Sequence, residues 1–150
     1  SVPVYLISVS DSFSTGFAGL KKAIVPLLTE LNETEIAINN LPAEESAPTR
    51  GKKLQLMTES NDTLQKILEV EKQRVVLFRQ HVLRTLYADD QGLFAFYDIP
   101  PGKYMVFVEG TIKKRTTIWK ANIALEEGQN VKLNFGEHNV RGMGGWMKDD

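Results

Sequence analysis

The sequence predicts a mainly β fold, an antiparallel β-sandwich with a long helical hairpin inserted after the first strand. Short apolar strands joined by tight turns run from residue 85 to residue 110. A heptad-spaced segment separates them from the first strand. Alternating apolar and polar residues from 117 to 135 are typical of strands with one wet face. We expect one domain over residues 1–150, with strands at about 2–9 and 84–135, the insertion at about 12–83, and an irregular tail at 136–150.

The first strand, residues 2–9, is apolar on both faces. Val4 and Leu6 share one face, and Tyr5 and Ile7 share the other. Neither face can therefore simply lie in water. We expect the second face to be covered by the base of the hairpin or by a partner, which could be a second copy of the chain.

The insertion predicts two helices, because a structureless loop of this length is improbable in a compact domain. The first apolar row is Phe13, Phe17, Leu20, Ile24, Leu27, Leu31, Thr34 and Ile38. The second is Leu54, Met57, Asn61, Leu64, Leu68, Glu71, Val75, Phe78 and Val82. Folding the chain in the proline-containing turn at 42–51 brings Ile38 beside Leu54 and Ile24 beside Leu68. Pro26 predicts a kink rather than an end, since the row continues beyond it.

Two turns organise the strands between residues 85 and 110. In the first, Asp89 can accept hydrogen bonds from its own backbone, and Gly92 tolerates a positive φ. In the second, Pro100 and Pro101 fix the backbone and Gly102 releases it.

These turns carry a motif that resembles the carboxypeptidase regulatory-like, transthyretin (prealbumin)-like β-sandwich family. Collagen-adhesin B-type repeats and starch-binding-like modules are its relatives. The residues that carry the resemblance are Asp89, Gly92, Phe94, Phe96, Ile99, Pro100, Pro101, Gly102 and Tyr104. The resemblance implies a prealbumin-like sandwich, a further strand before Val2 and a location in the periplasm or outside the cell. It implies no particular activity, since function is argued from a site.

Composition sets the remaining bounds. The 150 residues carry a formal net charge of -1, which gives no overall attraction to nucleic acid or an anionic membrane. The absence of cysteine excludes disulfides and thiolate metal sites. No apolar run is long enough to span a bilayer, and no signal peptide is visible. Because the chain opens on a strand, we expect its start to be processed or engineered.

A search for chemistry favours structural roles. His81 and His138 lie in no ligand spacing, and Asp89 with Asp90 and Asp98 makes no calcium loop. The serines from 8 to 14 lack a nucleophile-elbow context, and one of them is expected to cap the first helix. We therefore predict a protein that is not an enzyme and has no metal or cofactor.

Two function classes remain. The first is a non-catalytic interaction or assembly module of the cell envelope, with the sandwich as base and the hairpin as partner-binding arm. The alternative is a carbohydrate-binding module that uses the sandwich loops. Possible ligand or partner contacts are Lys113, Lys114, Arg115, Tyr97 and Trp146. Trp119, in phase with Ala121 and Ile123, is expected in the core.

Overall fold

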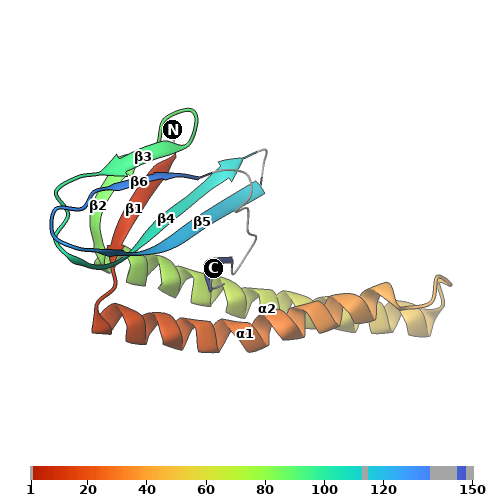
Figure 1. The fold of residues 1–150 in the computed structure, drawn as a ribbon. Helices are drawn as coiled ribbons and strands as arrows, with labels where there is room; N and C mark the ends of the chain where they lie inside the picture. The colour runs from red at the N-terminus through yellow and green to blue at the C-terminus, as the bar shows by residue number, and fades with distance from the viewer. Residues whose placement is uncertain (1, 113–114, 136–144, 148–150) are drawn as a thin grey trace. The chain divides into compact units, whose positions relative to one another are not determined.

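The structure, a computed structural model, describes residues 2–112, 115–135 and 145–147. Its elements are β1 (Pro3–Ser8), α1 (Asp11–Asn39), α2 (Ala47–Gln80), β2 (Val82–Tyr87), β3 (Leu93–Phe96), β4 (Gly102–Ile112), β5 (Arg115–Leu125), β6 (Val131–Asn134) and a 3-10 helix, η2 (Gly145–Met147) (Figure 1). They form two compact units. The helical unit is Ala18–Val75, and the sheet unit is Ser1–Phe17 with Val76–Asp150.

The sheet unit contains two antiparallel sheets. The larger has the order β2-β1-β4-β5, and Figure 1 shows β1 (red) between β2 and β4. The smaller consists of β3 and β6. Strand β1 is central because it pairs along both edges, with Val4 opposite Leu86 of β2 and Val108 of β4.

The prediction of a mainly β, prealbumin-like sandwich is wrong. The two α-helices, of 29 and 34 residues, make up nearly half of the described residues, and the second sheet formed by the described strands has only two of them. Six strands lie close to where the sequence predicts them, but four of them join one sheet. The alternation of apolar residues specifies that a segment is a strand with a buried face. It does not specify which edge that strand will pair with.

Two connections differ from what their own residues suggest. The polar, basic segment 111–116 suggests a turn, but Thr111 pairs with Thr116 and Ile112 with Arg115, so these four residues belong to strands. The segment 126–130 is not a hairpin turn. It links β5 of the larger sheet to β6, whose partner is β3. A short polar loop with a glycine is compatible with either connection, so the sequence could not decide between them.

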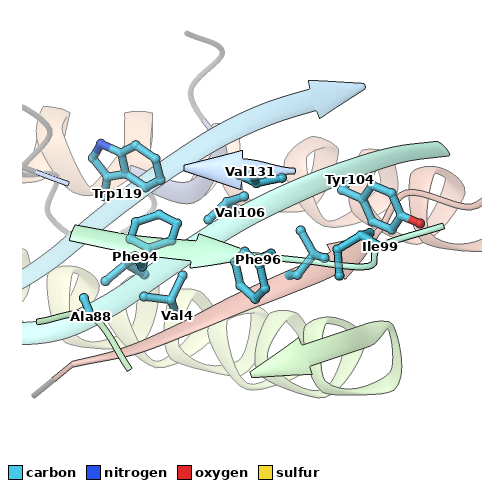
Figure 2. Close-up of a cluster of buried hydrophobic side chains, with 11 residues drawn as sticks. Val4, Ala88, Phe94, Phe96, Ile99, Tyr104, Val106, Trp119 and Val131 are labelled. Carbon is cyan, nitrogen blue, oxygen red and sulfur yellow. The ribbon is translucent and has the colours of Figure 1, made fainter. Parts of the chain in front are cut away.

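The main core lies between the two sheets. Phe94 and Phe96 of β3 face the larger sheet, with Trp119 and Tyr104 at the two ends of the cluster (Figure 2). The ring of Phe94 meets that of Trp119 edge to face at 5.9 Å. Trp119 is 6% exposed, so the prediction that it belongs to the core is confirmed.

A second aromatic cluster covers the other face of the larger sheet. Phe78, near the end of α2, meets Phe107 of β4 edge to face at 4.9 Å. Phe13 and Phe17 of α1 stack at 5.5 Å and lie within 6.0 Å of Phe78. Trp146 of η2 lies 5.6 Å from Phe17. The expectation that the base of the hairpin covers this face is therefore confirmed, and η2 contributes to the cover.

Serine caps begin both helices. Ser10 Oγ accepts a hydrogen bond from the Phe13 N–H at 3.1 Å, which confirms the expected serine cap. Ser46 Oγ accepts one from the Thr49 N–H at 3.3 Å. Helix α2 thus begins at Ala47, inside the predicted turn, because Pro48 is tolerated in a first helical turn. Helix α1 continues through Pro26, as predicted.

The turn before β3 is tied by Asp89. Its Oδ1 accepts hydrogen bonds from the N–H groups of Gln91 and Leu93, both at 2.9 Å. Gly92 follows with φ of 80°, a conformation that favours glycine. Both motif residues therefore act in the way that the sequence predicts for a turn.

Replacing Gly92 with alanine is expected to lower the free energy of unfolding by about 2–3 kcal/mol. A Cβ there would lie 2.4 Å from the carbonyl oxygen of Phe135, in addition to the positive-φ strain. Gly128 is the matched control, because it has φ of 79° and nothing within 4 Å of a built Cβ. Gly128→Ala should lose only about 1 kcal/mol in urea unfolding. Equal losses for the two variants would contradict the close approach at Gly92.

Candidate interaction surface

Helix α2 presents two apolar rows. The buried row is Leu56, Thr63, Ile67, Val70, Arg74 and Phe78. The first part of the row that the sequence predicts as the contact with α1 lies outward instead, whereas Phe78, near the end of that predicted row, is buried. Leu54 is 68% exposed, Met57 52% and Leu68 39%. The predicted pairing of Ile38 with Leu54 and of Ile24 with Leu68 is therefore wrong.

The polar members of the buried row explain this error. Thr63 is 2% exposed and Arg74 4% exposed, and both interrupt the apolar pattern at 56, 67 and 70. Arg74 donates a hydrogen bond to Glu71 at 3.0 Å, which lets its guanidinium remain charged inside the protein. A prediction based on the spacing of apolar residues alone therefore selects the row that begins at Leu54 as the buried one, although the row that begins at Leu56 is buried. By contrast, the row predicted for α1 is confirmed, since Leu20, Ile24 and the other members are buried or half-buried.

The outward residues Leu54, Met57, Leu64 and Leu68, called the α2 exposed row from here on, follow one strip of the helix surface. Spacings of three and four residues keep them on one side. Leu64 is half-buried, and the polar Asn61 lies in the middle of the strip. The strip is about 21 Å long at 1.5 Å per residue.

A hollow lies at the tip of the helical unit, beside the N-terminal end of this row. Its volume is about 520 Å³. Its lining mixes acidic and basic side chains with apolar ones: Ile38, Asn39, Leu41, Pro42, Ala43, Glu44, Glu45, Thr49, Arg50 and Lys53. The mixed charge does not point to one class of small ligand. We therefore treat the hollow as surface next to the α2 exposed row and not as a separate ligand site.

A second hollow, of about 500 Å³, lies on the smaller sheet. It is lined by Leu93, Phe94, Ala95, Lys132, Leu133 and Asn134. It is shallow and open to solvent, and its lining brings no convergent set of polar groups together. Small-ligand sites usually bury most of their ligand. This hollow therefore supports no specific ligand.

The expected ligand contacts lie in different places. Tyr97 is 51% exposed, whereas Trp146 is 0% exposed and packs in the aromatic cluster. Arg115 begins β5, opposite Ile112. Lys113 and Lys114 lie outside the described residues. Of the aromatic side chains considered as sugar platforms, only Tyr97 offers a surface in the described part of the chain.

The remaining motif residues support the fold. Tyr104 donates its hydroxyl hydrogen to the carbonyl oxygen of Pro100 at 2.6 Å, which fixes the second turn on the core. Asp98, before that turn, has φ of 56°, and Arg84 donates to its carbonyl oxygen at 3.4 Å. Gly102 opens β4 opposite Leu125.

Lys120 of β5 is a buried cation, although its position close to Lys113, Lys114 and Arg115 in the sequence suggests a solvated basic patch. It is 4% exposed. Its Nζ donates to the carbonyl oxygen of Trp146 at 3.2 Å and lies 5.7 Å from the ring centroid of Phe17. These contacts attach η2 to the face of β5. The alternation of side chains along β5 could have predicted this burial, because Lys120 lies on the same face of the strand as the buried Ile118 and on the opposite face from Trp119.

Neither histidine is placed for chemistry by the described structure. The ring of His81 meets Phe13 edge to face at 5.5 Å, and its Nδ1 lies 3.5 Å from Ser10 Oγ. His138 lies outside the described residues. No group of three or more His, Asp or Glu side chains among the described residues could hold a metal ion. None of the described helices has a stretch apolar enough to cross a bilayer.

Comparisons with family models, curated proteins and solved structures find no match to this chain. The resemblance to carboxypeptidase regulatory-like domains therefore stays a prediction that rests on the motif residues alone. Among the described residues, the α2 exposed row is a regularly spaced set of exposed apolar side chains on a single helix.

Proposed function

We propose that this chain is a non-catalytic interaction module whose helical hairpin is the partner-binding arm. The α2 exposed row is its contact surface. The observation that supports the proposal is the exposure of Leu54 and Met57, each more than half exposed, on a helix whose other apolar row is already buried.

Single exposed leucines are common on protein surfaces, whereas several exposed apolar side chains on one face of a helix are typical of an interaction site. Spacings of three and four residues are those by which a helix offers its apolar side chains to a partner groove or helix. Each exposed side chain leaves apolar area in water that binding would remove, at roughly 25 cal/mol per Å². Around the row the surface is charged, with Lys66, Glu69 and Lys72 exposed. Such a polar surround keeps an unbound arm in solution.

The cell envelope is the proposed location, as the resemblance implies. The partner is a protein that contributes an apolar surface, because the row offers few hydrogen-bonding groups. Asn61 lies between the apolar residues of the row, and a partner helix on the row would bury it. A buried asparagine between apolar positions commonly fixes the register of a helix pair.

The test replaces Leu54, Met57 and Leu68 with glutamine and compares capture from an envelope extract. We expect the triple variant to retain at least tenfold less of the partner that the unaltered chain retains, since loss of about 1.4 kcal/mol is a factor of ten. All three side chains are more than a third exposed, so the fold should be unchanged by circular dichroism.

The matched control replaces Gln55, Asp62 and Glu69 with alanine. These exposed residues lie on the same helix, next to the row but outside it. The control should capture the partner normally. A photo-crosslinking residue at position 61 should also label the same partner. Equal capture by both triple variants would show that the row is not the contact surface.

A further inference from the structure

Strand β2 forms an edge of the larger sheet. It pairs with β1 on one side, and no other described strand pairs with it. The register places Val4 opposite Leu86 and Leu6 opposite Arg84. An edge strand presents a row of backbone N–H and C=O groups that can pair with another chain.

The phase of the ladder identifies the groups that point outward. The Ala88 N–H donates to the carbonyl oxygen of Val2 at 3.2 Å, so this pair exchanges hydrogen bonds toward β1. In an antiparallel ladder such pairs alternate along the strand. The backbone N–H and C=O groups of Leu86 and Arg84 therefore also point toward β1. The backbone groups of Thr85 and Tyr87 point away from β1, and among the described residues no hydrogen bond to them is found. Leu83 lies outside this alternation, because the register shifts there: Leu6 pairs with Arg84 and Ile7 with Val82, which leaves Leu83 as the extra residue of a β-bulge.

The side chains of these three residues are suited to strand pairing. Tyr87 is 65% exposed, Leu83 is 43% exposed, and Thr85 is exposed between them. Tyrosine and threonine favour β structure, and leucine is not among the residue types depleted in strands. The six residues of β2 contain no glycine, proline or lysine, and Arg84 is the one charged residue.

The smaller sheet shows the protective features that β2 lacks. Strands β3 and β6 have four residues each. The Leu93 N–H and C=O on the edge of β3 are occupied by Asp89. Lys132 lies within β6. Short edges, occupied backbone groups and lysine all discourage pairing with another chain.

We propose that β2 pairs with β2 of a second copy of this chain, so that two larger sheets join edge to edge about a two-fold axis at Thr85. Antiparallel pairing about that residue places Thr85 opposite its own copy. It places Leu83 opposite Tyr87 of the other copy, and Tyr87 opposite Leu83. The two copies of Thr85 have their backbone groups pointing across the new interface, so this pair can exchange two hydrogen bonds.

The self-complementarity of the strand argues for a second copy rather than a foreign segment. An isologous two-fold interface needs one surface that fits itself. Threonine opposite threonine is a favourable cross-strand pair, and leucine opposite tyrosine places two largely apolar side chains next to each other. The single charge is also accommodated, because Arg84 falls opposite Leu86 of the other copy and not opposite another arginine. A register shifted by one residue would instead pair Thr85 with Arg84 or Leu86, whose backbone groups face β1.

The experiment compares the unaltered chain with Thr85→Pro and Thr85→Val by light scattering and sedimentation over a hundredfold range of concentration. One chain has a mass of 16.9 kDa, and the unaltered chain is expected to approach twice that mass as concentration rises. Thr85→Pro removes an outward N–H without touching the bonds to β1, and proline is tolerated on such an edge. It should raise the dimer dissociation constant at least tenfold. Thr85→Val keeps the N–H and should leave the dimer unchanged.

Tyr87→Lys provides a second disruption that spares the backbone, in case proline unfolds the strand. It should also give the single-chain mass, with an unchanged circular dichroism spectrum. Amide exchange of Thr85 should slow as the unaltered chain is concentrated. A single-chain mass for the unaltered chain at every concentration overturns the proposal. So does a dimer that survives both disruptions, and so does a dimer lost only when the α2 exposed row is changed.

Discussion

Replacing Trp146 with alanine is expected to lower the free energy of unfolding by about 3–5 kcal/mol, the usual loss for a buried tryptophan. The side chain is 0% exposed, and its ring lies 5.6 Å from Phe17 and 6.5 Å from Phe78. The measurement is urea unfolding followed by far-ultraviolet circular dichroism. An unchanged denaturant slope would assign the difference to stability.

The control for this variant is Tyr97→Ala, another aromatic truncation at a side chain that is 51% exposed. It should lose less than about 1 kcal/mol. The emission of the unaltered protein should also lie at short wavelength, because both of its tryptophans, Trp119 and Trp146, are buried. A loss for Trp146→Ala no larger than that for Tyr97→Ala would contradict the packing of η2 against the aromatic cluster.

Replacing Phe94 with alanine is expected to lower the free energy of unfolding by about 3–5 kcal/mol as well. Phe94 is 7% exposed and lies between the two sheets, with its ring near Trp119, Phe96 and Phe135 (Figure 2). The cavity left behind would border Trp119. We expect its emission to shift to longer wavelength in a Trp146→Phe background, where Trp119 is the only tryptophan and an aromatic ring still occupies position 146.

Leu93 provides the matched control, because it is the neighbouring residue on the same strand and faces outward at 46% exposure. Leu93→Ala should lose less than about 1 kcal/mol. If the two variants lost the same free energy, or if Leu93→Ala lost more, β3 would not present Phe94 to the larger sheet.

The two proposed surfaces lie in different units and can be tested independently. Changes at Leu54, Met57 and Leu68 should affect capture of a partner protein. Changes at Thr85 and Tyr87 should affect the mass of the chain alone. If the triple variant of Leu54, Met57 and Leu68 no longer captures the partner protein but still forms the dimer, the result supports the helical arm as the contact surface for the partner.

The sequence by itself determined the local structure. The position of β1 follows from its two apolar faces, and the turn before β3 follows from Asp89 and Gly92, each suited to its place. The buried row of α1, Leu20 and Ile24 among its members, follows from heptad spacing without a polar competitor. In these segments the local preferences all favour one structure, so no distant contact was needed to choose it.

Only the tertiary structure decided how the segments combine. The apolar rows at 54–68 and 56–78 of α2 have similar spacing, and the buried one is set by packing that also accommodates Thr63 and Arg74. The strands divide four and two because β1 pairs with both β2 and β4. Trp146 is buried because its ring packs against Phe17 and Phe78 at the bases of the two helices, while Lys120 of β5 donates to its carbonyl oxygen. The period of apolar residues in the sequence indicates that a face of a helix or strand is buried. Which element covers that face depends on contacts between residues far apart in the sequence.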